Sequence, residues 1–320
     1  MLGVVTALLV ATCLDTQPPA RSAYVEILER YRAGDDSAAG TLASLDEKDV
    51  QPVQDALLGV ALVAHTDAAL ALLEAADFAR SRQHLTRAQS YAERIQSKNR
   101  ADPLARRWWT LAIGYMHAER NYVGALKVIE RARTLSGDSP DLLLAAAITN
   151  ELTASGRRGR EPGAPQLGSF QQAETLYKSA LAADPSLLEA QLRLARVHTL
   201  RGDNASAARM LSRFQLPDDP LFTYLARLFE GDALERLGSI DEAKRRYAAA
   251  IALFPRAQSG QMALAYALQS AGGYNEAAER LQTIAADDIA AAADPWFWYS
   301  SGFASRIDES LIELRKRVRQ

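Results

Sequence analysis

Few residues in this sequence have the types and spacing that chemistry at a protein site requires. The single cysteine, Cys13, can form no disulfide within the chain and no cysteine-rich zinc site. The four histidines, His65, His84, His117 and His198, never fall at the spacing of a metal-ligand pair on one helix. We therefore expect each histidine to be a partly exposed helix residue. The usual phosphate-binding, nucleophile-elbow and zinc-protease motifs are all absent.

Acidic side chains recur three positions apart on predicted helices, as in Glu26 and Glu29 or in Asp232 and Glu235. Two such carboxylates could act as a general acid and base only if burial raised the pKa of one of them. Helix surfaces carry many such pairs, and the sequence gives no sign that these are buried. The sequence therefore predicts no catalytic residue, no cofactor and no metal. An enzyme with a site between helices remains a remote alternative.

The N-terminal run 1–14, MLGVVTALLVATCL, carries no charge, and a polar, proline-rich stretch follows. This run is shorter than the roughly 20 residues of a membrane-spanning helix, but it suits the apolar region of a signal peptide, although a basic start is missing. The tetrapeptide VATC, which ends at Cys13, resembles a bacterial lipobox with an unusually bulky Thr12. We expect residues 1–20 to be a signal peptide or an N-terminal hydrophobic segment. The protein would then be exported, either periplasmic or lipid-anchored at Cys13; a cytoplasmic protein with an apolar first helix is the alternative.

The composition is that of a globular protein with a net charge close to zero. Of the 320 residues 48% are hydrophobic, which is ample for a core, and the net charge is only −2. A chain of this charge has no basic surface to attract nucleic acid, so we expect no nucleic-acid partner.

Five alanines stand in similar surroundings near the start of predicted helices: Ala125, Ala173, Ala207, Ala243 and Ala277. The last four follow one another at nearly equal intervals of about 34 residues, a period that indicates a repeated helix–turn–helix unit. The first interval is wider. An insertion at 155–168, where the sequence is rich in glycine, proline and arginine, explains the difference.

The clearest unit runs from Tyr224 to about Ala257. Gly231 stands where its first helix would pack closely, Gly238 at the turn, Tyr247 on the second helix and Pro255 at its end. With four further units in the same phase, this pattern resembles the tetratricopeptide repeat family.

The resemblance implies an all-α fold, an α-solenoid of antiparallel helix pairs that winds into a right-handed superhelix. It covers residues 102–284, with the insertion at 155–168. Before the array, residues 21–101 are interpreted as degenerate helical repeats. After it, residues 285–320 are expected to form capping helices that close the end of the solenoid.

The aromatic cluster WFWYSSGF near the C-terminus could form an exposed stacking platform, but its helical spacing favours the core. Trp296, Tyr299 and Phe303 are therefore expected to be buried. Trp109 matches a packing position of the family, whereas the neighbouring Trp108 could be exposed.

In this family, the first helix of each pair lines a concave groove that binds the partner. The resemblance places these candidate partner-binding residues in the groove: Arg107, Thr110, His117, Glu189, Arg196, Thr199, Asp232, Glu235, Met262, Tyr266 and Gln269. The remaining groove positions are Gly114, Leu192, Leu225, Leu228 and Ser259.

Some family members clamp the carboxylate of a chaperone tail with lysines and asparagines at these positions, and this chain has neither there. The expected partner is therefore an extended or helical segment of another protein. Membrane attachment is expected only through the N-terminus. The interpretation is a non-catalytic scaffold or adaptor in the cell envelope, with a cytoplasmic adaptor or regulator as the alternative.

Overall fold

The computed structural model of the chain describes residues 23–45, 57–156, 170–214, 218–286 and 294–319. Every regular element in these ranges is a helix, which confirms the all-α prediction. None of the described helices is long and apolar enough to span a membrane. Residues 1–20, Cys13 among them, and almost all of the predicted insertion at 155–168 lie outside the described residues. The chain divides into two compact units, residues 1–91 with 318–320, and residues 92–317.

The first unit is built around one helix that is apolar on nearly every side. Its elements are α1 (Ala23–Arg32), α2 (Ser37–Ala43), α3 (Leu58–Glu74) and α4 (Phe78–Lys98), the last as far as residue 91. Helix α3 has almost no polar face, and both α1 and α2 pack against it. One side of α1 is apolar and buried, and it includes Tyr24 and Tyr31.

Two histidines of the first unit meet in its core. The Nδ1 atoms of His65 and His84 lie 2.7 Å apart, and the Nε2 of His65 lies 2.9 Å from the hydroxyl of Tyr24. Burial, followed by the proximity of His84, holds the pKa of His65 well below its ordinary value. The expectation of partly exposed histidines is wrong for His65, His84 and also His117, which are all buried. Each finds a hydrogen-bonding partner far away in sequence, and sequence spacing does not reveal such a partner.

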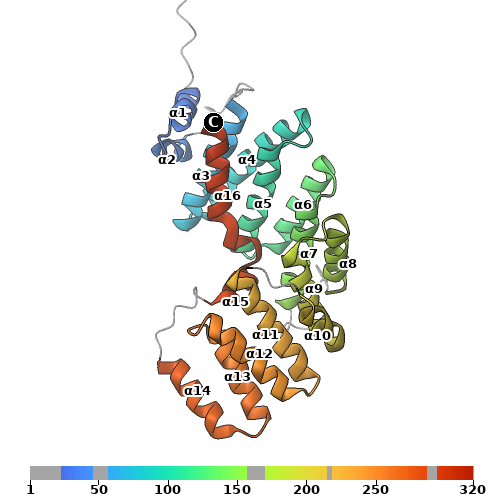
Figure 1. Cartoon of the computed structure of the whole chain (residues 1–320). Coiled ribbons are helices and arrows are strands. Elements are labelled where there is room, and N and C mark those ends of the chain that lie inside the picture. The colour runs from blue at the N-terminus through green and yellow to red at the C-terminus, as the bar shows by residue number, and fades with distance from the viewer. Residues whose placement is uncertain (1–22, 46–56, 157–169, 215–217, 287–293, 320) are drawn as a thin grey trace, which may run out of the picture. The chain divides into compact units, whose positions relative to one another are not determined.

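The second unit contains five consecutive helix pairs (Figure 1). They are α5 (Pro103–Ala118) with α6 (Tyr122–Ser136), α7 (Pro140–Ser155) with α8 (Phe170–Ala183), α9 (Leu188–Arg201) with α10 (Asn204–Ser212), α11 (Pro220–Arg236) with α12 (Ile240–Leu253), and α13 (Gln258–Ser270) with α14 (Tyr274–Ala286). Each helix packs on the next one along the chain. The first helices of successive pairs also contact one another: α5 contacts α7, and α11 contacts α13. This arrangement is that of an α-solenoid.

The repeat phase rests on small residues at the close contacts. The five alanines that define the period all lie on second helices and are all buried. A Cβ atom on Gly231 would overlap the ring of Tyr247, so the first and second helices of that pair approach as closely as predicted. Gly238 has a φ of +82°, in the left-handed region that favours glycine, and it ends the turn between the two helices.

The two neighbouring tryptophans of α5 both belong to the core. Trp108 and Trp109 are fully buried and meet edge to face at 5.0 Å between ring centroids. The indole N–H of Trp109 donates to the side chain of Gln96 at 2.8 Å. Trp108 is thus not exposed, because its ring packs on that of Trp109 inside the core.

The last part of the chain folds back along the first helices of the array. We call residues 295–317 the C-terminal segment: it comprises α15 (Pro295–Ser301), the 3₁₀ helix η4 (Gly302–Arg306) and α16 (Ile307–Arg319) up to residue 317. Helix α15 contacts α11, and η4 contacts α5 and α7 (Figure 1). The expectation that these helices cap the end of the solenoid therefore needs correction. Tyr299 and Phe303 are buried as predicted and Trp296 is half-buried, but their rings pack on first helices of the pairs, on Phe229 of α11 and on His117 of α5.

Candidate functional site

The predicted groove residues fall into two main groups in the structure. Four of them face the C-terminal segment: Arg107, Gly114, His117 and Glu189. Seven line an open pocket further along the array: Arg196, Leu228, Asp232, Glu235, Ser259, Met262 and Tyr266.

The remaining predicted positions belong to neither group. The hydroxyls of Thr110 and Thr199 donate hydrogen bonds to backbone carbonyls of their own helices. Gln269 is exposed and lies next to the pocket-lining Ser270 in the sequence. Leu192 and Leu225 are fully buried in the core.

The groove is closed at α5 by η4. The carbonyl oxygen of Phe303 would lie only 2.7 Å from a Cβ atom on Gly114, so the absence of a side chain at this position allows the two backbones to meet. One turn further along α5, the Nδ1 of His117 accepts a hydrogen bond of 3.2 Å from the backbone N–H of Phe303. Burial, followed by the nearby charge of Arg193, lowers the pKa of His117 to about 3. The ring is therefore neutral at pH 7, as an accepting Nδ1 requires.

A buried ionic cluster fastens the next part of the C-terminal segment. Arg193, which is fully buried, donates to Glu189 at 2.8 Å and to the backbone carbonyl of Tyr299 at 2.8 Å, and it pairs with Glu151 at 3.4 Å. Burial opposes its charge, but the carboxylates of Glu189 and Glu151 outweigh this and raise the pKa of Arg193. The hydroxyl of Tyr299 donates to Glu151, and Arg306 pairs with Glu189. Burial works against ionisation of Glu189, yet the two arginines hold the pKa of its carboxyl below the ordinary value.

The sequence prediction missed Glu151 and Arg193, the centre of this cluster. Arg193 stands one turn after Glu189, a spacing typical of exposed helix pairs. Only the alternation of apolar residues around it, in LEAQLRLARV, hints that this face of α9 is buried. The role of Glu151 has no local signal, because its partners Tyr177, Arg193 and Tyr299 lie on other helices.

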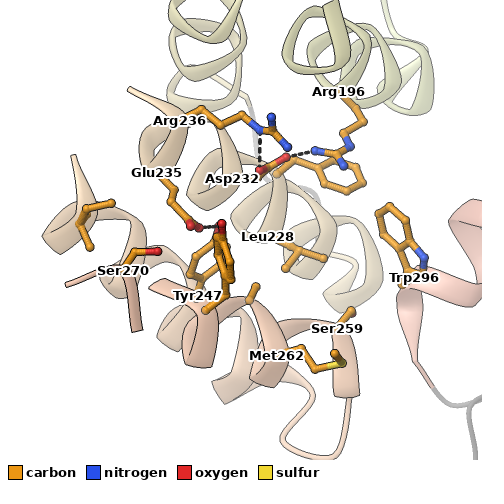
Figure 2. A pocket seen from close by; sticks show the side chains of 14 residues that line it. Arg196, Leu228, Asp232, Glu235, Arg236, Tyr247, Ser259, Met262, Ser270 and Trp296 are labelled. Carbon is orange, nitrogen blue, oxygen red and sulfur yellow. Dashed lines mark hydrogen bonds and ion pairs between the residues drawn. The ribbon is translucent and has the colours of Figure 1, made fainter. Parts of the chain in front are cut away.

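Beyond the C-terminal segment, the groove opens into a pocket of about 780 Å³ (Figure 2). Its lining comes from α9, α11, α12, α13 and α15, all within the second unit. Leu228, Phe229 and Ala263 provide apolar walls, and Trp296 of α15 stands at the side that adjoins the filled groove. The pocket has the size and mixed lining of sites that hold a ligand or an anchoring side chain.

Charged groups run along one side of the pocket. Asp232 lies between two arginines, since it accepts from the Nε of Arg236 at 2.8 Å and also pairs with Arg196 (Figure 2). The guanidinium of Arg196 lies over the rings of Phe229 and Trp296, at 5.2 and 5.8 Å from their centroids. These cation–π contacts, together with the ion pair to Asp232, stabilise Arg196 within the wall of the pocket.

The second carboxylate of the pocket, Glu235, has a neutral hydrogen-bond donor, whereas Asp232 is paired with two arginines. It accepts a hydrogen bond of 2.8 Å from the hydroxyl of Tyr247. Partial burial, together with the like charge of Asp232, raises the pKa of Glu235 above its ordinary value. The sequence offers no sign of this desolvation.

Two large apolar side chains of α13 are exposed at the pocket. Met262 is 54% exposed and Tyr266 is 64% exposed, whereas the other face of the same helix is buried. Exposed apolar side chains grouped around a cavity are typical of a protein-interaction site. Among the described residues, no group of three His, Cys, Asp or Glu side chains could hold a metal ion.

Comparisons with known proteins agree with this architecture. The sequence model of the tetratricopeptide repeat family matches residues 166–227. No curated protein sequence matches the chain. A solved tetratricopeptide repeat protein from Parabacteroides merdae ATCC 43184 is 14% identical, with 81% of this chain and 92% of that chain covered and a TM-score of 0.51.

Solved MamA structures are also similar. MamA from Desulfovibrio magneticus RS-1 is 18% identical, with 54% of this chain and 89% of that chain covered and a TM-score of 0.42. At these identities the structural likeness concerns the fold alone. The family model, the Parabacteroides merdae structure and the five helix pairs lead to one conclusion: residues 166–227 match the tetratricopeptide repeat family, and the chain has the α-solenoid fold of a tetratricopeptide repeat protein.

Proposed function

We propose that this protein is a non-catalytic interaction scaffold that binds an extended or helical segment of another protein in the open pocket. Tetratricopeptide solenoids in general use their concave surfaces to bind proteins. In this chain, part of that surface is already occupied by the C-terminal segment. The observation that carries the proposal is the exposure of Met262 and Tyr266 beside a pocket of about 780 Å³, the part of the groove that stays open.

A pull-down with the full chain as bait tests this proposal. The informative variant replaces both Met262 and Tyr266 by glutamate, which places charge on the exposed apolar surface. The matched control is Tyr274→Glu, because Tyr274 is 66% exposed on α14 and does not line the pocket. We expect the wild type and the control to retain the same proteins and the double variant to lose them. Equal retention by all three baits would overturn the assignment of the pocket.

We propose in addition that the scaffold works in the bacterial cell envelope, where it is periplasmic or anchored by a lipid on Cys13. The support is the apolar run of residues 1–14, which ends next to that cysteine. A reporter enzyme that functions only outside the cytoplasm, fused after Gln320, should be active. An inactive reporter would favour the alternative of a cytoplasmic adaptor. Cys13→Ser should release an anchored protein from the membrane fraction.

Enzymatic activity is the remote alternative. A hydrolase and transferase screen with the purified protein tests it directly. Reproducible turnover that a single pocket substitution abolishes would replace the scaffold proposal.

A further inference from the structure

The C-terminal segment shows how this groove holds an occupant. It buries Tyr299 and Phe303 among the groove helices, at 4% and 3% exposure, and sets the guanidinium of Arg306 against the carboxylate of Glu189. The same guanidinium lies over the ring of Phe303, at 4.8 Å from its centroid. The scheme is thus an aromatic anchor, a second aromatic four residues later beyond the end of α15, and an arginine three residues after that, which pairs with a carboxylate of α9.

The open pocket continues this filled part of the groove without interruption. Trp296 packs on Tyr299 with ring centroids 5.3 Å apart and on Phe229 at 6.0 Å, and it also lines the pocket. Trp296 therefore belongs both to the aromatic contacts of the C-terminal segment and to the wall of the open pocket.

The pocket repeats the chemistry of the filled part. Leu228 and Phe229 provide an apolar floor, and the exposed ring of Tyr266 provides a free aromatic face. A carboxylate lies at one end, since Glu235 lines the pocket beside Tyr247 (Figure 2).

Glu235 differs from Asp232 in its pairing. The charge of Asp232 is neutralised by Arg196 and Arg236, whereas none of the residues that the structure describes forms an ion pair with Glu235. A cation from outside would compensate this carboxylate, and it would do so beside aromatic faces that favour cations. The buried Nε of Arg196, which also has no described acceptor, is covered by the surrounding side chains and offers nothing to a ligand.

We propose that the pocket recognises a short segment of a partner protein that carries an aromatic anchor and, seven residues further as in Tyr299 and Arg306, a basic side chain. The aromatic ring lies between Met262, Tyr266 and Trp296, and the basic group pairs with Glu235. The segment thus copies in trans the scheme that the C-terminal segment uses in cis. This inference rests on the proposed function, because it specifies the partner of the same pocket.

A binding measurement with two synthetic peptides tests the inference. The first peptide copies residues 294–307, and the second is identical except for the change R306E; each carries a fluorescent label for anisotropy titrations against the full chain. We expect the first peptide to bind and the second to bind about tenfold more weakly, because one ion pair becomes a repulsion. Glu235→Gln should largely abolish the difference, and Tyr266→Ala should weaken both peptides.

Several results would contradict the inference. No binding of the first peptide, equal binding of both, or tighter binding of the acidic peptide would each overturn the basic-aromatic scheme. Binding that survives both Glu235→Gln and Tyr266→Ala would place the peptide elsewhere, for example in the filled groove after displacement of the C-terminal segment. After such a result, a pull-down that still depends on Met262 and Tyr266 would mean that the pocket binds a partner, but not through an aromatic and a basic side chain. A pull-down that does not depend on them would contradict the proposed function as well.

Discussion

The Nδ1 atom of His117 on α5 accepts a hydrogen bond from the backbone N–H of Phe303 in η4, 186 residues further along the chain. Because Nδ1 accepts, the proton of the neutral ring lies on Nε2, which faces the hydroxyl of Thr149 at 2.9 Å. The hydroxyl of Thr149 in turn donates to the carbonyl of Ala145 at 2.7 Å. One neutral histidine therefore connects α5, α7 and the C-terminal segment.

The first prediction is that acid loosens the C-terminal segment. The folded pKa of His117, about 3, lies below the ordinary value of 6.5, so its neutral form contributes stability that is complete above about pH 6.5. That contribution decreases as the pH falls from about 6.5 towards 3, and the linkage relation gives a loss of about 2 kcal/mol at pH 5. A proton on Nδ1 would also remove the acceptor for the N–H of Phe303. Amide hydrogen exchange of residues 295–306, corrected for the intrinsic effect of pH, should become faster at pH 5 than at pH 7.5.

His117→Asn is the matched control for this prediction. The asparagine side chain offers an oxygen near the former Nδ1 and cannot be protonated in this range. Its corrected exchange rates should change less between the two pH values than those of the wild type. Equal acceleration in both proteins would assign the effect to other groups, such as the buried His65 and His84.

The second prediction concerns the close approach of α5 and η4. Gly114→Ala places a methyl group 2.7 Å from the backbone carbonyl of Phe303, and backbone yields less readily than a flexible side chain. Overpacking of this kind costs about 1–3 kcal/mol. Gly40→Ala in α2 is the control, since its new methyl group meets no atom within 4 Å and a helix interior prefers alanine by about 0.5–1 kcal/mol. Thermal unfolding should show a loss for the first variant and none for the second; an unchanged Gly114→Ala would argue against the contact.

The third prediction concerns the buried ionic cluster. Arg193→Met leaves Glu151 and Glu189 buried with fewer partners, and breaking such a cluster costs about 3–5 kcal/mol. Arg193→Lys should recover little of this loss, because a single ammonium cannot reproduce the planar contacts to Glu189, Glu151 and the carbonyl of Tyr299. Urea unfolding measures both variants. A lysine variant as stable as the wild type would show that charge alone, without the geometry of the guanidinium, holds the cluster together.

The sequence predicts much of the fold and several of the residues that line the pocket. Small residues such as Ala243 and Gly231 define the repeat, because only they allow the close helix contacts, and their spacing is visible without a structure. The resemblance to tetratricopeptide repeats implies that Met262, Tyr266 and Glu235 lie in one groove, and in the structure the three line one pocket. The period within a helix pair is local information, so it can be read from the sequence.

The path of the C-terminal segment could not be predicted in the same way. The helical spacing of Trp296, Tyr299 and Phe303 indicates burial, but it does not say which surface covers them. Their partners lie far away along the chain, as in the contact of Tyr299 with Arg193 and Glu151. For this reason the sequence assigns His117 and Glu189 to a partner protein, whereas they hold the chain's own segment.

We expect a partner to bind at α13, because η4 of the C-terminal segment already packs on α5. Site-specific photo-cross-linking measures this, with a benzophenone amino acid placed either at position 266 or at position 110, one turn before Gly114. In the presence of a partner captured by the wild-type bait, we predict an intermolecular product from position 266 and only intramolecular products from position 110. An intermolecular product with the same partner from position 110, and none from position 266, would show that the partner binds at α5 and not at the open pocket.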